Sequence, residues 1–456
     1  MTNSVELNLG SVFGLDASGG TGKTFTLIYL INLLRSQEKV VLASAASAIA
    51  SRLLPRGKTF HGITKCPIVL TEETMCNIKE NSSTAELISS CSLFIVDEIT
   101  MLNRKAIEAA DRTFQWIRNC DKPFGGVTVL FSGDWRQMLP IVRNAGKTEI
   151  INATLKSSYL WENVIPLKLT RNMRLQQENG DNTSTEFERY ILKIGNGEIA
   201  YEEGKGDSMI KLDEDIIFSG DTLDNLIDWV YPNLEENMHD VDWLQKRAIL
   251  SPKNVEVDMV NEAVAKKLPG QMEKRLSADS VEHNQIHLFP VEYLNTLCPS
   301  GLPPHELILK KGMIIMLLRN FDQDEGHCNG SRYIIRHLKQ NVIIAELLTG
   351  INAGTILCIP RIRMSPAENI FPFQFTRLQF PVRPCYAMTV SKAQGQTLKQ
   401  VGVFTLSDFF GHGQLYVAAS RAQSKEKFKI LALDNDRELQ KKIYLKNIVY
   451  FEILSS

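Results

Sequence analysis

Short apolar runs alternate with helix-like stretches along the first third of the chain. Four of these runs predict β-strands: Val12–Leu15, Lys39–Ala43, Leu93–Val96 and Val127–Phe131. Helices are expected from the Gly-rich turn after the first run to about Arg35, and over Lys105–Arg118. This alternation predicts a parallel sheet with helices on both faces, on which ligands bind at the carboxyl ends of the strands.

The pattern changes in the middle of the chain. Residues 175–222 are polar and in part Gly-rich, which predicts a connection holding one helix at about Thr185–Ile194. Strand and helix alternate again from Lys246 through Lys267. Residues 295–380 are rich in Pro, Gly and β-branched residues, and runs such as MIIMLL, NVIIAELL and RLQFPV predict a small β-barrel-like insert. Alternation resumes at Tyr386.

These segments predict an α/β protein with two parallel-sheet domains, the second interrupted by a β module. A chain of 456 residues is too long for a single core. The expected division is 1–168 for the first domain, 169–294 for the first part of the second, 295–380 for the insert and 381–456 for the remainder.

Composition narrows the classes of protein. The formal net charge is -1, so an interaction with nucleic acid must rest on local sites. The eight cysteines are scattered without a CxxC pair, which argues against a zinc ribbon and for a reducing compartment. The N-terminus lacks the features of a signal peptide, and the longest apolar-rich run, Phe25–Leu34, is too short to span a bilayer. We therefore expect an intracellular protein without a membrane partner.

The Gly-rich turn over residues 17–24 reads ASGGTGKT and matches the phosphate-loop pattern except that Ala17 replaces its first Gly. The loop residues expected to hold a nucleotide are Gly19, Gly20, Thr21 and Gly22. Their backbone N–H groups and the helix N-terminus behind them suit a β-phosphate. Lys23 is expected to contact the β- and γ-phosphates, and Thr24 to bind Mg²⁺. The sequence thus predicts ATP and Mg²⁺, against the alternative of a Gly-rich turn with an incidental Lys.

Two further motifs fall at predicted strand ends. In LFIVDEIT, Asp97 is expected to hold Mg²⁺ and Glu98 to orient and deprotonate the attacking water; the alternative is a solvated acidic strand end. In LFSGDWRQMLP, Gln137 is expected to sense the γ-phosphate or its water. Asp134 and Trp135 would lie between the nucleotide and a bound polymer, although Trp135 also fits core packing.

Transition-state charge on the γ-phosphate calls for cations besides Mg²⁺. Arg174 in LTRNMRL and Arg421 in LYVAASRA each follow an apolar segment and are candidate arginine fingers. If both come from the second α/β domain, ATP lies in a cleft between domains, and its hydrolysis opens and closes that cleft as in a motor. A surface salt bridge is the alternative for either arginine.

Motifs in a fixed order carry a resemblance to a known family. They are GGTGKT, VDEITML, KPFGGVTVLFSGDWRQMLP, LTRNMRL, AMTVSKAQGQTL and QLYVAASRAQ. The set resembles the petite-integration-frequency (Pif-type) family of superfamily-one DNA helicases, with the region from Asp97 to Val142 similar to that family's signature. Segments such as LPPHELILKKGMIIMLLRN and RLQFPVRPCYAMT look most like the helicase part of Helitron transposons. The resemblance runs from about residue 12 to 452.

The resemblance implies an ATP-dependent helicase that moves 5′-to-3′ on single-stranded DNA and unwinds duplexes, including forked DNA. It implies two RecA-like domains with ATP between them and an SH3-like module inserted in the second. It also implies work in recombination, repair or telomere maintenance, in the nucleus or the mitochondrion, by a protein expected to be a monomer.

The resemblance also implies roles for particular residues. The catalytic set is Lys23, Thr24, Asp97, Glu98, Gln137, Arg174 and Arg421. Gly395 and Gln396 lie in KAQGQT, where the family couples ATP to DNA, and Gly395 is counted with the nucleotide site. The residues implied to grip single-stranded DNA are Thr59, Phe60, His61, Thr389, Ser391 and Lys392. Such a grip uses hydrogen bonds and aromatic stacking, although Phe60 also fits a packed core.

The chain departs from the family pattern at three places: Ala17, Gly62 where Ser is usual, and the stretch before the first strand. The family has an adenine-gripping segment with a Gln there, and the stretch before Val12 holds no Gln. One alternative is therefore a truncated, transposon-derived remnant that binds single strands with weak or no turnover. A phosphate-loop ATPase acting on protein partners is a further alternative, and hydrolysis indifferent to DNA would favour it.

Overall fold

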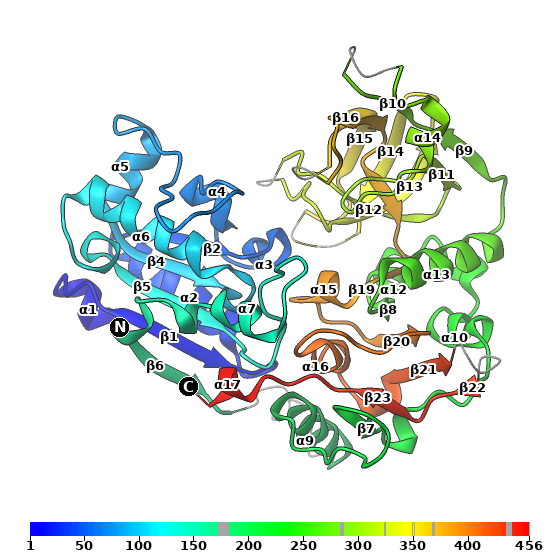
Figure 1. The fold of residues 1–456 in the computed structure, drawn as a ribbon, viewed down its shortest axis with the longest axis horizontal. Coiled ribbons are helices and arrows are strands. Elements are labelled where there is room, and N and C mark those ends of the chain that lie inside the picture. Colours follow the sequence, from blue (N-terminus) through cyan, green and yellow to red (C-terminus); the bar gives the residue numbers. More distant parts are fainter. Residues whose placement is uncertain are drawn as a thin grey trace. The chain divides into compact units, whose positions relative to one another are not determined.

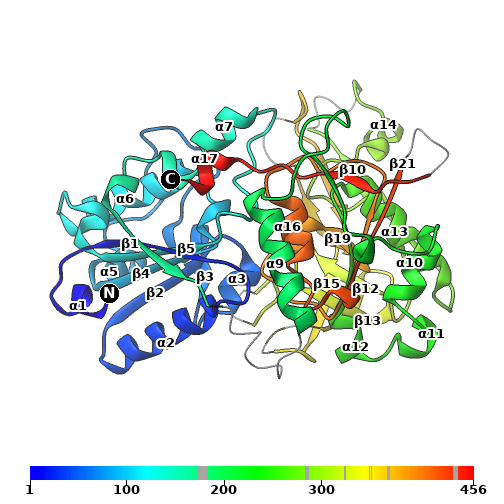
Figure 2. The same cartoon turned by 90° about the horizontal axis from the view of Figure 1, so that it is seen from below.

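Two units divide the chain in the computed structural model (Figures 1 and 2). The structure describes residues 1–171, 182–282, 287–322, 325–348, 350, 352–366, 370–434 and 440–455. For residues 182–185 it describes the backbone alone. Unit 1 comprises Met1–Leu212, Asp408–Lys425 and Tyr444–Ser456, and unit 2 comprises Asp213–Ser407 and Glu426–Ile443. The boundaries expected at residues 168, 294 and 380 stay predictions.

Within its described residues, unit 1 is built on a six-stranded parallel sheet with the order β3-β2-β4-β5-β1-β6. The strands are β1 (Val12–Ala17), β2 (Val40–Ala45), β3 (Lys58–Thr59), β4 (Cys91–Asp97), β5 (Thr128–Gly133) and β6 (Val164–Leu169). The four strands expected from apolar runs are present as β1, β2, β4 and β5. The expectation of a parallel sheet is therefore confirmed.

Helices cover both faces of this sheet, as Figure 2 shows for α2 and α6. Among its described residues, the helices of unit 1 are α1 (Thr2–Glu6), α2 (Lys23–Ser36), α3 (Ala48–Arg52), α4 (Phe60–Thr64), α5 (Ser83–Ser89), α6 (Arg104–Arg118), α7 (Lys147–Asn152), α9 (Asn182–Asn196), α16 (Gln414–Ala419) and α17 (Phe451–Leu454). Side chains alternate between the faces along β4, as the strand period of two requires. Leu93 and Ile95 belong to the core under α2, whereas Phe94 and Val96 belong to the core under α6.

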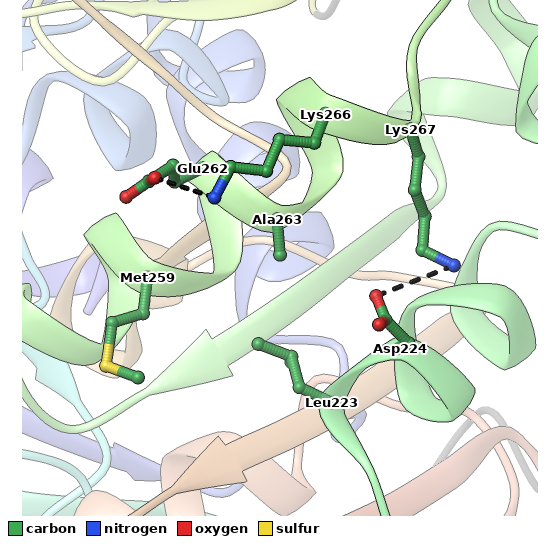
Figure 3. A pocket seen from close by; sticks show the side chains of 7 residues that line it. All are labelled: Leu223, Asp224, Met259, Glu262, Ala263, Lys266 and Lys267. Atoms are coloured by element: carbon green, nitrogen blue, oxygen red, sulfur yellow. Dashed lines mark ion pairs between the residues drawn. The ribbon is translucent and has the colours of Figure 1, made fainter.

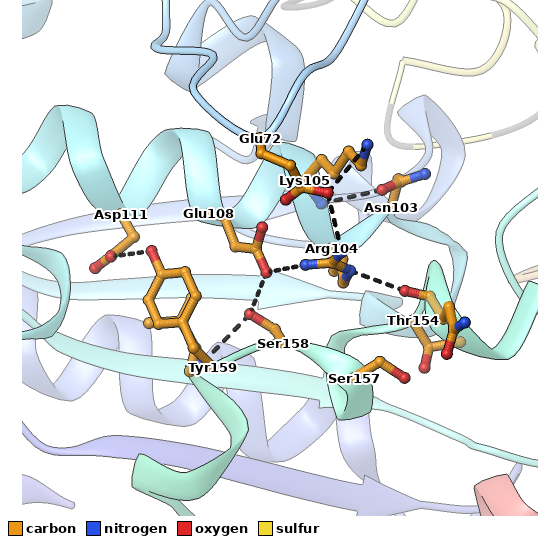
Figure 4. Close-up of polar contacts among 12 residues, drawn as sticks. Glu72, Asn103, Arg104, Lys105, Glu108, Asp111, Thr154, Ser157, Ser158 and Tyr159 are labelled. Atoms are coloured by element: carbon orange, nitrogen blue, oxygen red, sulfur yellow. Dashed lines mark hydrogen bonds and ion pairs between the residues drawn. The ribbon is translucent and has the colours of Figure 1, made fainter. Parts of the chain in front are cut away.

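Buried polar side chains fix α6 to the segment that follows it (Figure 4). Glu108 accepts hydrogen bonds from Arg104 Nη1 at 2.9 Å and from Ser158 Oγ at 2.7 Å. One turn further along, Asp111 accepts a hydrogen bond from the Tyr159 hydroxyl at 2.7 Å. Carboxylates buried in this way are stable because partners replace the lost water.

Unit 2 contains, among its described residues, a five-stranded sheet with the order β19-β8-β20-β21-β22, parallel except for β22. Its strands are β19 (Ala387–Thr389), β8 (Arg247–Ser251), β20 (Gln400–Thr405), β21 (Phe428–Asp434) and β22 (Gln440–Lys441). Its helices are α10 (Leu223–Val230), α11 (Leu234–Asn237), α12 (Val241–Gln245), α13 (Asn254–Lys267) and α15 (Val390–Ala393). The strand and helix expected from Lys246 to Lys267 are thus confirmed.

A β module interrupts unit 2. Its elements are β9 (Glu273–Leu276), β10 (Ala278–Ser280), α14 (Val291–Thr296), β11 (Glu306–Leu309), β12 (Ile314–Leu317), β13 (Arg332–Leu338), β14 (Val342–Leu347), β15 (Ile356–Pro360), β16 (Ile362–Met364), β17 (Thr376–Gln379) and β18 (Val382–Pro384). The strands β15-β14-β13-β12-β18 form an antiparallel sheet in that order.

Smaller elements complete both units. In unit 1, β7 (Met209–Lys211) pairs antiparallel with β23 (Tyr444–Lys446). Single 3₁₀ turns lie at Ile99–Met101, Pro123–Gly126, Leu155–Ser157, Trp161–Asn163, Glu214–Ile216 and Lys425–Lys427. Across the described residues, no helix combines the length and the apolar character needed to cross a membrane.

A groove of about 630 Å³ lies between α10 and α13 of unit 2 (Figure 3). Its lysines are already paired with carboxylates. Lys266 Nζ lies 2.9 Å from Glu262, and Lys267 Nζ lies 2.8 Å from Asp228 and 3.6 Å from Asp224. The groove contains none of the residues predicted to act on a nucleotide or on DNA.

A buried ion pair joins β10 to β17 in the β module. Arg377 donates to both oxygens of Asp279, at 2.8 and 2.6 Å, and both side chains are fully buried. We expect Asp279→Ala to lower the free energy of unfolding by about 3–5 kcal/mol, because it leaves an unpaired guanidinium in the core. Denaturant unfolding followed by circular dichroism measures this. The exposed carboxylate Asp224→Ala serves as control and should cost less than about 1 kcal/mol; equal costs would contradict the prediction.

Candidate nucleotide site

The loop between β1 and α2 has the backbone that a phosphate cradle requires. Gly20 and Gly22 adopt left-handed φ angles of 85° and 86°, which strain any residue with a side chain. Thr21 closes the loop on itself through a hydrogen bond from its hydroxyl to the Ser18 carbonyl at 2.8 Å. A Cβ added at Gly19 would meet no atom within 4 Å, so this part of the loop faces open space. The helix α2 begins at Lys23 with its N-terminus toward the loop, the end of a helix that favours an anion.

Lys23 connects the phosphate loop to the acidic end of β4. Its Nζ lies 2.8 Å from Asp97 Oδ1 and 2.7 Å from Glu98 Oε1, and all three side chains are largely buried. Burial disfavours the ammonium, but the two carboxylates outweigh it and raise the pKa of Lys23. Burial raises the pKa of Asp97, and Lys23 opposes this shift. The structure thus brings together three residues that the sequence placed in two separate motifs.

Glu98 stands in a strained backbone conformation. Its φ and ψ of 53° and 41° lie in the left-handed region, where a residue with a side chain costs about 1–2 kcal/mol. The turn follows the last residue of β4 and starts the 3₁₀ turn Ile99–Met101. A solvated strand end would not require this geometry, and the side chain is turned toward Lys23.

The candidate ligands for Mg²⁺ are the Thr24 hydroxyl and the Asp97 carboxylate. Thr24 follows Lys23 at the start of α2, and Asp97 ends β4. Hydroxyl and carboxylate oxygens are ligands that Mg²⁺ prefers, and Mg²⁺ is often held by one or two protein groups together with substrate phosphates. No group of three or more His, Cys, Asp or Glu side chains able to hold a metal lies in the described parts of the chain. The donor set therefore suits a metal that arrives with a nucleotide.

The loop after β5 is buried. Gln137 is 5% exposed, and its Nε2 donates to Asp134 Oδ2 over a long 3.4 Å. Its Oε1 is buried and has no hydrogen-bond partner within the described part of the chain. Trp135 packs edge-on against Trp161, with ring centroids 5.8 Å apart and Lys156 over its face. Trp135 is therefore a packed side chain, which agrees with the core-packing alternative.

The two candidate arginine fingers differ in what the structure describes. Arg421 is buried, and its guanidinium donates to Val417 O at 3.0 Å and to Ser420 Oγ at 2.8 Å, back toward the end of the preceding helix α16. It lies on Asp408–Lys425, which belongs to unit 1, whereas the sequence placed it in the second domain. Arg174 lies outside the described residues.

Among the residues expected to grip DNA in unit 1, Phe60 requires a correction. Its ring is fully buried and packs against Phe94 with centroids 6.3 Å apart, so it cannot stack on a base in this structure. The core-packing alternative holds instead. Thr59 caps α4 by accepting a hydrogen bond from Gly62 N at 3.1 Å, and His61 is exposed. Roles of Thr59 and His61 on DNA stay predictions.

The unit 2 residues expected to grip DNA gather around α15. Thr389 precedes that helix, and Ser391 and Lys392 lie within it. Burial lowers the pKa of Lys392, while Cys385 opposes the shift. The neighbouring Gln394 was missed at the sequence level: it is buried, and neither amide atom finds a partner among the described residues. The signal in the sequence that could have identified Gln394 was its position in the motif KAQGQT.

Gly395 and Gln396 follow directly. Gly395 has a left-handed φ of 78°, which explains why a glycine stands there. Gln396 donates to the Lys392 carbonyl at 2.9 Å and so stays folded over the preceding turn. The role of Gly395 in the nucleotide site stays a prediction.

A phosphate loop beside an acidic strand end on a parallel sheet defines the class of phosphate-loop nucleotide-binding proteins. Comparison with known families narrows the class. Residues 1–205 match the model of the PIF1-like helicase family, and residues 292–338 match the 2B domain of DNA helicase Pif1. These two matches confirm the predicted resemblance to the PIF1-like helicases.

Relatives and solved structures agree with these matches. The chain is 24% identical to ATP-dependent DNA helicase Pif1 of Psychrobacter over 95% of its own length and 67% of the relative's, and 23% identical to PIF1 of Xenopus laevis over 91% and 58%. It thus spans about three fifths to two thirds of these relatives. Its fold is similar to Bacteroides Pif1 bound to single-stranded DNA, with a TM-score of 0.69, 22% identity, and coverage of 100% of this chain and 94% of that one. For Pif1 of Candida albicans these values are 0.67, 20%, 100% and 97%. The predicted α/β fold class is confirmed.

Proposed function

We propose that this chain is the motor of an ATP-dependent DNA helicase, which hydrolyses ATP and moves 5′-to-3′ on single-stranded DNA. The observation that carries the proposal is the buried cluster of Lys23, Asp97 and Glu98 beside the phosphate loop. The match to the PIF1-like helicase model supports it, as do similar proteins that are named ATP-dependent DNA helicases.

The cluster supports a mechanism in which ATP rearranges existing ion pairs. The phosphates would enter the loop and draw Lys23 from the carboxylates to the β- and γ-phosphates. Asp97, together with Thr24, would then be free to hold Mg²⁺, which neutralises phosphate charge. Glu98 would accept a proton from the attacking water, and Gln137 would orient that water. Arg421 would have to leave its contacts with Val417 and Ser420 to reach the γ-phosphate.

The proposed partners are single-stranded and forked DNA. A solved relative is Bacteroides Pif1 bound to single-stranded DNA, and another structure concerns two coordinating Pif1 helicases at forked double-stranded DNA. We extend these partners to this chain, with roles in recombination, repair or telomere maintenance. A monomeric state and a location in the nucleus or the mitochondrion stay predictions.

ATP hydrolysis with and without single-stranded DNA tests the proposal. We expect strong stimulation by the single strand, because a translocating motor couples each turnover to a step. Unwinding should follow for a duplex with a 5′ single-stranded tail and fail for the matched duplex with a 3′ tail.

Two results would reject this proposal. Hydrolysis indifferent to DNA would instead favour an ATPase that acts on protein partners. Binding of the single strand without any turnover would favour the remnant that has lost its motor.

A further inference from the structure

Asp134 is a buried centre to which three side chains of unit 1 donate hydrogen bonds. It has no exposed surface. Its Oδ1 accepts from Arg136 at 2.8 Å. Its Oδ2 accepts from the Tyr416 hydroxyl at 2.6 Å and from Gln137 Nε2 at 3.4 Å. One carboxylate oxygen therefore contacts both the predicted γ-phosphate sensor and α16, the helix that precedes Arg421.

A second buried contact joins the same two segments. His412 Nε2 lies 2.9 Å from the Trp135 carbonyl, and the backbone N–H of Tyr450 donates to His412 Nδ1 at 2.9 Å. Because a backbone N–H can only donate, Nδ1 is the acceptor and the ring proton sits on Nε2, from which it is donated to Trp135. Burial lowers the pKa of His412 and keeps this neutral form.

The backbone at the start of α16 leaves no space between the segments. Gly413 has a left-handed φ of 70°, and a Cβ added there would lie 2.2 Å from the Arg136 carbonyl oxygen. Glycine is needed at this point because the N-terminus of α16 lies directly on the chain at Arg136 and Gln137. The loop after β5 and α16 are thus held together by side-chain and backbone contacts.

The chemistry of Asp134 sets the orientation of the Gln137 amide. A carboxylate only accepts hydrogen bonds, so the amide end turned toward it is the NH₂ group. The opposite end, Oε1, remains without a partner within the described residues. An amide oxygen held in this way accepts a hydrogen bond from water, whereas the reverse orientation would turn the NH₂ donor toward the phosphate.

We propose that Tyr416 and Asp134 are positioning residues, which hold the Gln137 amide with its oxygen toward the attacking water and join it to the helix that precedes Arg421. This inference rests on the proposed function, because it assigns a role within the same hydrolytic site. Burial and Asp134 raise the pKa of Tyr416 well above its ordinary value, so its hydroxyl remains a donor throughout the pH range of an assay.

Tyr416→Phe tests the role, because it keeps the ring and removes the hydroxyl. We expect kcat for DNA-stimulated ATP hydrolysis to fall roughly tenfold, the size of one hydrogen bond to a charged group. The KM for ATP and the affinity for single-stranded DNA should stay within about twofold of the wild-type values, because Tyr416 is not among the residues expected to bind ATP or DNA. A purely structural defect would lower the fraction of folded protein and the thermal midpoint, and kcat calculated per folded molecule would then equal that of the wild type.

Two tyrosines serve as matched controls. Tyr159→Phe removes a hydroxyl bound to the Asp111 carboxylate at 2.7 Å in unit 1 (Figure 4). Tyr231→Phe removes an equally buried hydroxyl bound to the Tyr386 carbonyl at 2.6 Å. Both should leave kcat unchanged. If Tyr416→Phe behaves as these two do, the inference is wrong.

A double-mutant cycle shows whether Tyr416 acts through Gln137. In a Gln137→Ala background, Tyr416→Phe should cause no further loss of kcat, whereas independent roles would multiply the two losses and overturn the inference. Should Tyr416→Phe fail to fold, Asp134→Asn takes its place in the same cycle. A wild-type protein without DNA-stimulated hydrolysis contradicts the proposed function. A hydrolysing wild type with a silent Tyr416→Phe contradicts the inference alone.

Discussion

Lys23→Ala is expected to abolish ATP hydrolysis by this protein while its fold persists. The variant removes the cation that would follow the β- and γ-phosphates into the transition state. Loss of one such group costs about 10²–10³ in kcat, and the same lysine also binds the phosphates of the substrate. Turnover should therefore fall below detection at ordinary enzyme concentrations.

The fold should persist because the two carboxylates can respond to the loss. Without Lys23, burial and mutual repulsion favour a shared proton between Asp97 and Glu98. Turnover is measured together with thermal unfolding. Lys267→Ala is the matched control, since Lys267 also contacts two carboxylates, Asp224 and Asp228, but on the surface of unit 2. Retained turnover in Lys23→Ala would reject the assigned nucleotide site.

Glu98→Gln is expected to separate binding from chemistry. The amide keeps the length of the side chain but cannot take a proton from water, so kcat should fall about 10²–10⁴-fold. Binding of ATP should persist, because Lys23 would still contact the phosphates and Asp97 would still hold Mg²⁺. Single-turnover hydrolysis and the affinity for a slowly hydrolysed ATP analogue measure the two effects.

The control for this variant is Glu72→Gln, which changes an exposed carboxylate paired with Arg104 and Lys105 in the same unit. Its kcat should equal that of the wild type. A Glu98→Gln protein with undiminished kcat would show that another group accepts the proton, and the role given to Glu98 would be withdrawn.

Local patterns explain why much of unit 1 could be predicted from the sequence. Apolar runs at strand spacing, a glycine turn and an amphipathic helix each depend on neighbours in the chain, and they gave β1, β2, β4, β5, α2 and α6. β6 was missed because VIPLKL contains Pro166 and its apolar and polar residues alternate only weakly. Both features suit an edge strand, and in the described sheet β6 pairs with β1 alone.

Contacts between distant segments could not be predicted in this way. The spacing of motifs placed Lys23, Asp97 and Glu98 at strand ends, and the known geometry of parallel sheets brought them together. No such rule links Tyr416 to Asp134, which lies 282 residues earlier, or places Phe60 under the sheet rather than on the surface. Burial depends on the whole fold, and a single sequence carries little of that information.

The chain passes between the two units four times, after Leu212, Ser407, Lys425 and Ile443. This path has a consequence for synthesis on the ribosome. The phosphate loop, the acidic strand end and the loop after β5 emerge first, but α16 and β23 are translated only after nearly all of unit 2. Asp134 and Trp135 are therefore synthesised long before their hydrogen-bond partners, Tyr416 and His412. The unit whose synthesis begins first is therefore completed last.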